Sequence, residues 1–146
     1  MKKMMNKKGF TLVELLAVIV ILAVIILVAM NAVIPQMEKA RKSAFKTEAE
    51  TYLKAAQTYY TSSKIDGSAE TCVTIDTLNN GYITKADDSY EGYVLMGETT
   101  DDFKIALTND EYSIGAAGSE MTLSEVADLD VSSLPAASSA ITSTCP

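Results

Sequence analysis

Residues 10–34 read FTLVELLAVIVILAVIILVAMNAVI, and this stretch decides the fold. No side chain from Leu15 to Met30 is polar, and the wider stretch is interrupted only by Thr11, Glu14 and Asn31. As an α-helix it would be roughly 37 Å long, enough to cross a hydrocarbon core of about 30 Å. A buried strand or the core helix of a soluble protein fits this length poorly. The stretch therefore predicts a membrane-inserted helix.

Three kinds of membrane segment compete: a cleaved secretory signal, an ordinary single-pass anchor, and a helix with a special role for its charged residue. A secretory signal has an apolar region of about 7–15 residues and a small-x-small cleavage site. The present run is longer, and residues 29–32 match such a site poorly. An ordinary anchor has no use for the carboxylate of Glu14, which costs free energy in lipid unless it is paired.

A candidate partner for Glu14 arises if the chain is cut between Gly9 and Phe10. The cut would create an α-amine on Phe10, which is largely protonated at neutral pH. On a helix Phe10 and Glu14 lie one turn apart, so the carboxylate could pair with the amine of its own chain or of a neighbour. The spacing is equally compatible with Glu14 extending to the lipid headgroups.

The segment Lys7-Lys8-Gly9-Phe10-Thr11-Leu12-Val13-Glu14-Leu15-Leu16 resembles the processing site of class III signal peptides, those of type IV prepilins and the related pseudopilins. The pattern is specific: a basic leader, Gly, Phe, Glu four residues on, and then an apolar helix. The resemblance implies that a membrane-embedded prepilin peptidase cuts after Gly9 and N-methylates Phe10. It also implies that Glu14 neutralises the amino terminus of a neighbouring subunit during filament assembly, which favours pairing between chains.

The pattern along the chain divides it into four parts. We predict a leader peptide over 1–9, a transmembrane and assembly helix over 10–34, an amphipathic continuation over 35–61 and a globular head over 62–146. Apolar side chains in the continuation recur every three or four residues, which is typical of a helix with one buried face. They are Met37, Ala40, Ala44, Ala49, Tyr52, Leu53, Ala56 and Tyr60, with Phe45 and Tyr59 beside them. We expect the aromatic residues to form core rather than an electron-transfer path.

The head is predicted to contain three antiparallel strands, at 91–97, 102–108 and 111–115. Phe103, Ile105 and Leu107 lie on one face of the second strand, so a small sheet with one apolar face can cover the amphipathic helix. The expected fold class is α+β: a long N-terminal α-helix, membrane-spanning in its first half, packed against a small antiparallel β-sheet head. The resemblance implies the same architecture, the pilin fold.

Two short helices are also predicted in the head. Residues 74–82 suggest a helix or turn with Gly81 as its left-handed cap. The sequence Thr122-Leu-Ser-Glu125 matches a capping box at the start of a helix over 123–129. The tail from Ser132 to Pro146 is rich in Ser, Thr and Ala and has little intrinsic structure.

Cys72 precedes the predicted strands, and Cys145 is the penultimate residue. If paired, they would close a long loop. The loss of entropy in the unfolded chain would then stabilise the fold by about 4 kcal/mol. One cysteine at each end of a small exported head favours pairing, while the alternative is two unrelated thiols in a reducing compartment. A carboxy-terminal disulfide loop is also common in type IV pilins.

The charge and residue content argue against several classes of function. The net charge is −7, and beyond the leader 8 basic residues face 19 acidic ones, which argues against nucleic-acid binding over the whole surface. The absence of histidine removes the usual zinc sites and any His-based triad. The acidic pairs lack the spacing of a calcium loop: Asp87-Asp88, Asp101-Asp102 and Asp128-x-Asp130. We expect no enzyme activity, cofactor or metal site.

Basic residues flank the apolar stretch equally, so they do not fix its orientation. Four precede it, Lys2, Lys3, Lys7 and Lys8, and four follow it, Lys39, Arg41, Lys42 and Lys46. The short leader can remain in the cytosol easily, and the cysteine pair favours an exported head. We therefore predict a cytosolic amino terminus.

Together these features predict the structural subunit of a type IV pilus, a helical homopolymer. The resemblance implies three partners: the prepilin peptidase, a membrane assembly platform and its ATPase motor. The chain would begin as a single-pass precursor in the cytoplasmic membrane and end in an extracellular filament. Two alternatives stay open: a pseudopilin of a type II secretion or competence system, and a signal-anchored surface binding protein that keeps its amino terminus.

Overall fold

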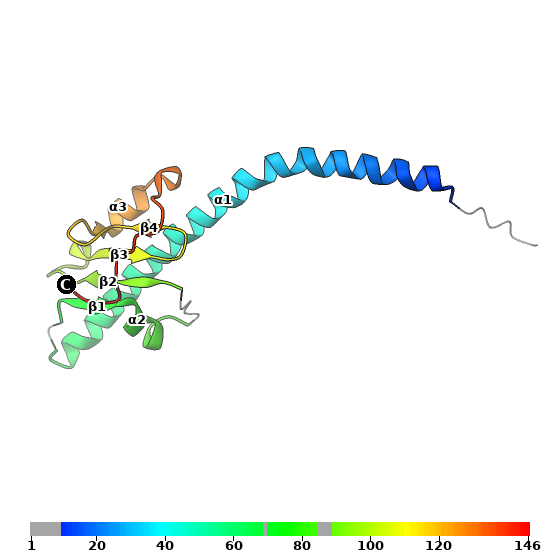
Figure 1. The fold of residues 1–146 in the computed structure, drawn as a ribbon. Coiled ribbons are helices and arrows are strands. Elements are labelled where there is room, and N and C mark those ends of the chain that lie inside the picture. Colours follow the sequence, from blue (N-terminus) through cyan, green and yellow to red (C-terminus); the bar gives the residue numbers. More distant parts are fainter. Residues whose placement is uncertain (1–9, 69, 85–88) are drawn as a thin grey trace, which may run out of the picture. The chain divides into compact units, whose positions relative to one another are not determined.

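The computed structural model describes residues 10–68, 70–84 and 89–146, and Figure 1 labels its larger elements. One long helix, α1, runs from Leu12 to Ile65 and passes through Pro35 without a break. The chain forms two compact units, of which the first ends at Glu38 and the second spans Lys39–Pro146.

The first unit is an exposed apolar helix. Each large apolar side chain from Leu12 to Met37 has half or more of its surface exposed. The helix is long and apolar enough to cross a membrane, and none of its most apolar window is buried against other residues. The predicted apolar helix is confirmed, and its exposed apolar surface is of the kind that a membrane or another protein covers.

The second unit contains a small antiparallel sheet. Its strands are β1 (Cys72–Thr74), β2 (Glu91–Leu95), β3 (Lys104–Thr108), β4 (Ser113–Ile114) and β5 (Met121–Thr122). The spatial order is β1-β2-β3-β4, and β5 pairs with the other end of β3. The three predicted strands are present, although each is shorter than expected, and the α+β class is confirmed.

β1 and β5 were not predicted from the sequence. They have three and two residues, too few to show a period-two pattern. Each exists because β2 or β3 offers a free edge to pair with: Val73 lies opposite Val94, and Met121 opposite Ile105.

The core lies between one face of the sheet and the part of α1 that belongs to the second unit. The residues of α1 that are buried are Phe45, Ala49, Tyr52, Leu53, Ala55, Ala56 and Ser63. Phe103, Ile105 and Leu107 are fully buried against them, as their alternation predicted. Tyr59 and Tyr60 pack at the edge of this cluster, and Tyr60 meets Phe103 edge-on. The aromatic side chains are therefore core residues, as expected.

The buried face of α1 begins later than the sequence predicted. Met37, Ala40 and Ala44 were expected to be buried, but all three are exposed, and the first buried side chain is Phe45. Periodicity identifies the apolar face of a helix, but the length that is covered depends on where the sheet returns against it. The helix also continues past Thr61 to Ile65 and is followed by Gly67, whose φ is 80°.

Two short helices complete the head: α2 (Ile75–Gly81) and α3 (Leu123–Asp128). The predicted capping box of α3 is confirmed, since Thr122 and Glu125 each bond the other's backbone N–H. The prediction for Gly81 is wrong: it is the last residue of α2 and is not among the glycines with positive φ. The N–H of Tyr82 closes the helix by donating to Leu78 O, so no left-handed residue is needed.

The tail is more ordered than its composition suggested. Two turns of 3-10 helix, η1 (Thr100–Asp102) and η2 (Val131–Ser133), lie in the head, the second at the start of the tail. Beyond η2, Ala136 forms a bridge with Tyr112, and Ile141 is only 2% exposed. Contacts with the sheet, rather than local propensity, hold these residues.

Lys46 of α1 forms hydrogen bonds to the end of α3. Its Nζ donates to the carbonyls of Ala127 at 2.5 Å and Leu129 at 3.1 Å, where the helix has unpaired acceptors and the negative end of its dipole. We expect Lys46→Met to lower the free energy of unfolding by about 1–2 kcal/mol, since two carbonyls lose a charged donor. Urea denaturation of the full chain in detergent micelles measures this loss. Lys54→Met, at an exposed position of the same helix, is the control and should change little; equal effects would contradict the role of Lys46.

Tyr93 lies on the face of the sheet opposite α1, which we call the outer face. Its hydroxyl donates to Glu120 Oε1 at 2.8 Å. Burial, and secondly this hydrogen bond, raise the pKa of Tyr93 to about 12. An unfolded tyrosine has a pKa of about 10, so this stabilisation is complete below that pH and is lost as the pH rises towards 12.

The alkaline stability of the head tests this interaction. We expect the free energy of unfolding to fall between about pH 10 and pH 12, and to fall less steeply in Tyr93→Phe. Tyr59 contributes to the remaining slope, because its hydrogen bond to Glu70 and its burial raise its pKa to about 12. Identical slopes in the variant and the parent chain would contradict the assignment to Tyr93.

Candidate assembly site

Glu14 takes part in a capping box at the first turn of α1. Thr11 precedes the first helical residue, and its Oγ1 accepts a hydrogen bond from the N–H of Glu14 at 3.2 Å. In return, Glu14 Oε2 accepts from the N–H of Thr11 at 3.2 Å and from its hydroxyl at 3.1 Å. The backbone N–H groups of Thr11 and Glu14 thereby each gain a side-chain acceptor from the other residue.

This arrangement also gives Glu14 a local electrostatic role within its own helix. A carboxylate at a helix amino terminus interacts favourably with the helix dipole and with backbone N–H groups. A carboxylate has about four lone-pair positions, so the two bonds from Thr11 leave capacity for a cation. The side chain is thus held at the helix start and remains able to accept an ammonium group.

Thr11 is the residue of this site that sequence reasoning missed. The signal was present, because Thr11-Leu-Val-Glu14 has the same T-x-x-E spacing as Thr122-Leu-Ser-Glu125. The motif lies directly before an apolar run, where a helix start is expected.

The other predicted residues of the processing site are only partly described. Phe10 lies just before the capping residue, and its side chain is 85% exposed. Gly9 and the rest of the 1–9 leader lie outside the described residues. Cleavage after Gly9, methylation of Phe10 and the assembly role of Glu14 therefore stay predictions.

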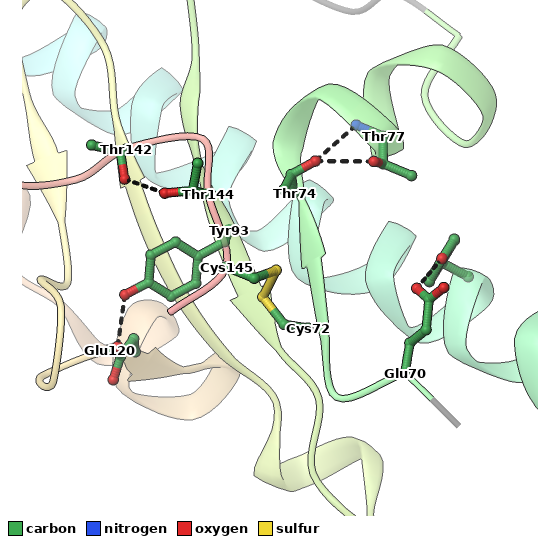
Figure 2. Close-up of a disulfide and its surroundings, with 10 residues drawn as sticks. Glu70, Cys72, Thr74, Thr77, Tyr93, Glu120, Thr142, Thr144 and Cys145 are labelled. Carbon is green, nitrogen blue, oxygen red and sulfur yellow. Dashed lines mark hydrogen bonds between the residues drawn. A yellow bond between two sulfur atoms is a disulfide. The ribbon is translucent and has the colours of Figure 1, made fainter. Parts of the chain in front are cut away.

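Cys72 and Cys145 are joined in a disulfide, which Figure 2 shows beside Tyr93. Their Cα atoms are 6.0 Å apart, and the bond connects positions 73 residues apart in the sequence. Cys72 is the first residue of β1, so the bond fixes the end of the chain to an edge strand.

In the described part of the chain, no group of three or more Cys, Asp or Glu side chains is placed to hold a metal ion. Two of the acidic pairs have local roles instead. Asp102 accepts a hydrogen bond from the hydroxyl of Thr99, and Asp130 accepts one from the N–H of Ser132. The third pair, Asp87 and Asp88, lies outside the described residues.

The described residues form an α+β protein. Its amino-terminal helix is exposed, carries a capped carboxylate in its first turn, and is long and apolar enough to span a membrane. The family model described as the prokaryotic N-terminal methylation motif matches residues 4–30. The "ComG operon protein 3 homolog" of Bacillus licheniformis is 31% identical over 81 residues, which cover 56% of this chain and 79% of that protein. No solved structure is significantly similar to the chain. The chain belongs to the family of type IV pilins and pseudopilins.

Proposed function

We propose that this chain is the structural subunit of a type IV pilus, which polymerises through its apolar helix after the leader is removed and Phe10 is N-methylated. The observation that carries the proposal is the exposed apolar surface of α1 from Leu12 to Met37, together with Glu14 in its first turn. The chain has no catalytic role in this proposal.

The exposed helix suits a subunit that leaves the membrane for a filament. Inside the bilayer its side chains contact lipid tails, and inside a bundle they contact the helices of other copies. Lipid tails and leucine-like side chains are similarly apolar, so the exchange loses little hydrophobic free energy. The association is then directed by packing and by the few polar groups, of which Glu14 is the charged one in this stretch.

In this mechanism Glu14 sets the position of each subunit along the filament axis relative to its neighbour. The capping box holds its carboxylate at the helix start, close in sequence to the α-amine that cleavage would create on Phe10. An incoming subunit places its own ammonium group at the carboxylate of its neighbour, and a close pair in an apolar surrounding is strongly favoured over either charge alone. The prepilin peptidase, an assembly platform and an ATPase motor in the cytoplasmic membrane are the partners this requires, and the filament is extracellular.

A second candidate is a pseudopilin of a competence system. It is favoured by the relative described as a ComG operon protein 3 homolog, which this chain matches over 79% of that relative's length. Pilins and pseudopilins share the amino-terminal motif, so the motif does not separate them. Electron microscopy of the cells separates the candidates: long extracellular fibres labelled by an antibody to the head support the pilus, and short envelope-bound fibres support the pseudopilin.

The mass of the mature protein tests the proposal as a whole. Intact mass spectrometry of chain purified from cells should give a form that starts at Phe10 and carries one methyl group. A form that starts at Met1 would instead support a signal-anchored surface binding protein and overturn the proposal. A start near residues 31–33 would indicate a secreted protein and would overturn it as well.

A further inference from the structure

The carboxy-terminal residues 134–146, here called the strap, are anchored first at the edge of the sheet formed by β4. The bridge between Tyr112 and Ala136 is flanked by two backbone hydrogen bonds. The N–H of Ser113 donates to Pro135 O at 3.2 Å, and the N–H of Ala137 donates to Glu111 O at 3.1 Å. This end of the strap is therefore held as a short additional strand.

The middle of the strap covers the outer face of the sheet. Ile141 is 2% exposed and packs with Tyr93 of β2 and Ala106 of β3, which are register partners. These residues form a cluster apart from the main core. Since neighbouring residues Val94 and Ile105 point into the main core, the strap lies on the opposite face from α1.

The far end of the strap is held by the disulfide to β1. The sheet order is β1-β2-β3-β4, so the strap begins at one edge, crosses the middle strands and ends at the other edge. Figure 2 shows its last residues, Thr142 to Cys145, passing beside Tyr93. The two ends are thus fastened by different means.

Between these ends the strap has few bonds to the rest of the head. Ser138 N–H donates to Thr108 Oγ1 at 3.4 Å. In the described part of the chain, the hydrogen bonds that residues 140–144 make stay within the strap: Ala140 N–H to Ser138 Oγ, Ile141 N–H to Ser138 O, and the paired hydroxyls of Thr142 and Thr144. Between residues 138 and 144, Ile141 is the buried apolar side chain that offsets the conformational entropy of this part of the strap.

We propose that the Cys72–Cys145 bond is a redox-sensitive latch, whose reduction frees residues 138–146 from the outer face while the helix–sheet core stays folded. An external dithiol supplies two electrons and two protons: the S–S bond breaks, two thiols form, and the dithiol is oxidised to its own disulfide. The core stays folded because its buried cluster lies on the other face of the sheet. The strap residue that belongs to this cluster is Leu134, which precedes the segment that opens.

Hydrogen exchange of the full chain in detergent micelles, with and without dithiothreitol, tests the latch. The chain has two cysteines, so the dithiol has a single target. We expect the hydrogen-bonded amides of Ser138, Ala140 and Ile141 to exchange about tenfold faster or more on reduction, as in a local opening. The amides of Ser113, Val94 and Ile105 should keep their rates. Unchanged strap amides would overturn the latch, and so would joint loss of protection in the strap and the core strands.

Two variants complete the test. The double variant Cys72→Ser/Cys145→Ser should show the fast strap exchange without dithiothreitol and no further change with it. Ile141→Ser with the disulfide intact should keep the core rates and expose the strap far less than reduction does. If Ile141→Ser alone frees the strap fully, the apolar contact rather than the disulfide holds it, and the proposal is wrong.

Discussion

Replacing Glu14 with Ala is expected to leave the chain in the membrane and to reduce its incorporation into filaments about tenfold or more. The apolar helix is unchanged, so insertion is retained. Loss of the carboxylate leaves an ammonium group unpaired in an apolar bundle, which costs about 2–5 kcal/mol for each subunit contact. Membrane fractionation and the yield of sheared fibres measure the two effects separately.

Glu14→Gln separates the two roles of the side chain. Its amide oxygen can still accept hydrogen bonds from Thr11, so the helix cap is kept, but the negative charge is lost. We expect Glu14→Gln to assemble as poorly as Glu14→Ala. Normal fibre yield from Glu14→Gln would mean that capping, rather than charge, is what assembly requires.

Gly92→Ala is expected to lower the free energy of unfolding of the head by about 3 kcal/mol or more. Gly92 has a φ of 143° and lies opposite Leu107 in the register of β2 and β3. An added Cβ would lie 2.1 Å from the carbonyl oxygen of Ala106, and this backbone atom belongs to the central strand pair. The strand must either shift or separate from its neighbour.

Gly81→Ala is the matched control for Gly92→Ala. Gly81 ends a helix, has no positive φ, and an added Cβ would meet nothing within 4 Å. We expect it to be neutral or to stabilise by up to about 1 kcal/mol, since Ala favours a helix over Gly. Urea denaturation of both variants in micelles gives the comparison, and equal midpoints for Gly92→Ala and the parent chain would refute the close strand contact.

The elements that the sequence predicts correctly are those built from local chemistry. The Thr122–Glu125 capping box forms because its partners are three residues apart. The turn that must join the strands predicted at 102–108 and 111–115 forms because the Asn109 side chain accepts from the N–H groups of Glu111 and Tyr112, which are its near neighbours. The same reasoning applied to Thr11 would have predicted the cap of α1.

The basic residues after the apolar stretch make contacts that spacing in the sequence does not predict. From the sequence, the four cations bear on membrane orientation and on pairing within their own helix. In the folded chain, Arg41 forms an ion pair with Glu111 at 2.8 Å, Lys42 lies over the ring of Tyr112, and Lys46 caps α3. Their partners are about 70 or more residues away in the chain, so spacing carries no sign of them.

The sequence alone determined the membrane helix, the α+β class and the amino-terminal motif, because composition and short-range spacing are enough to set each of them. Tertiary structure decided which length of α1 is buried, which glycine needs an unusual backbone, and which edges β1 and β5 join. It also decided that the tail crosses the outer face of the sheet. Each of these depends on contacts between residues far apart in the chain, which form only when the sheet has assembled and offers a surface or an edge.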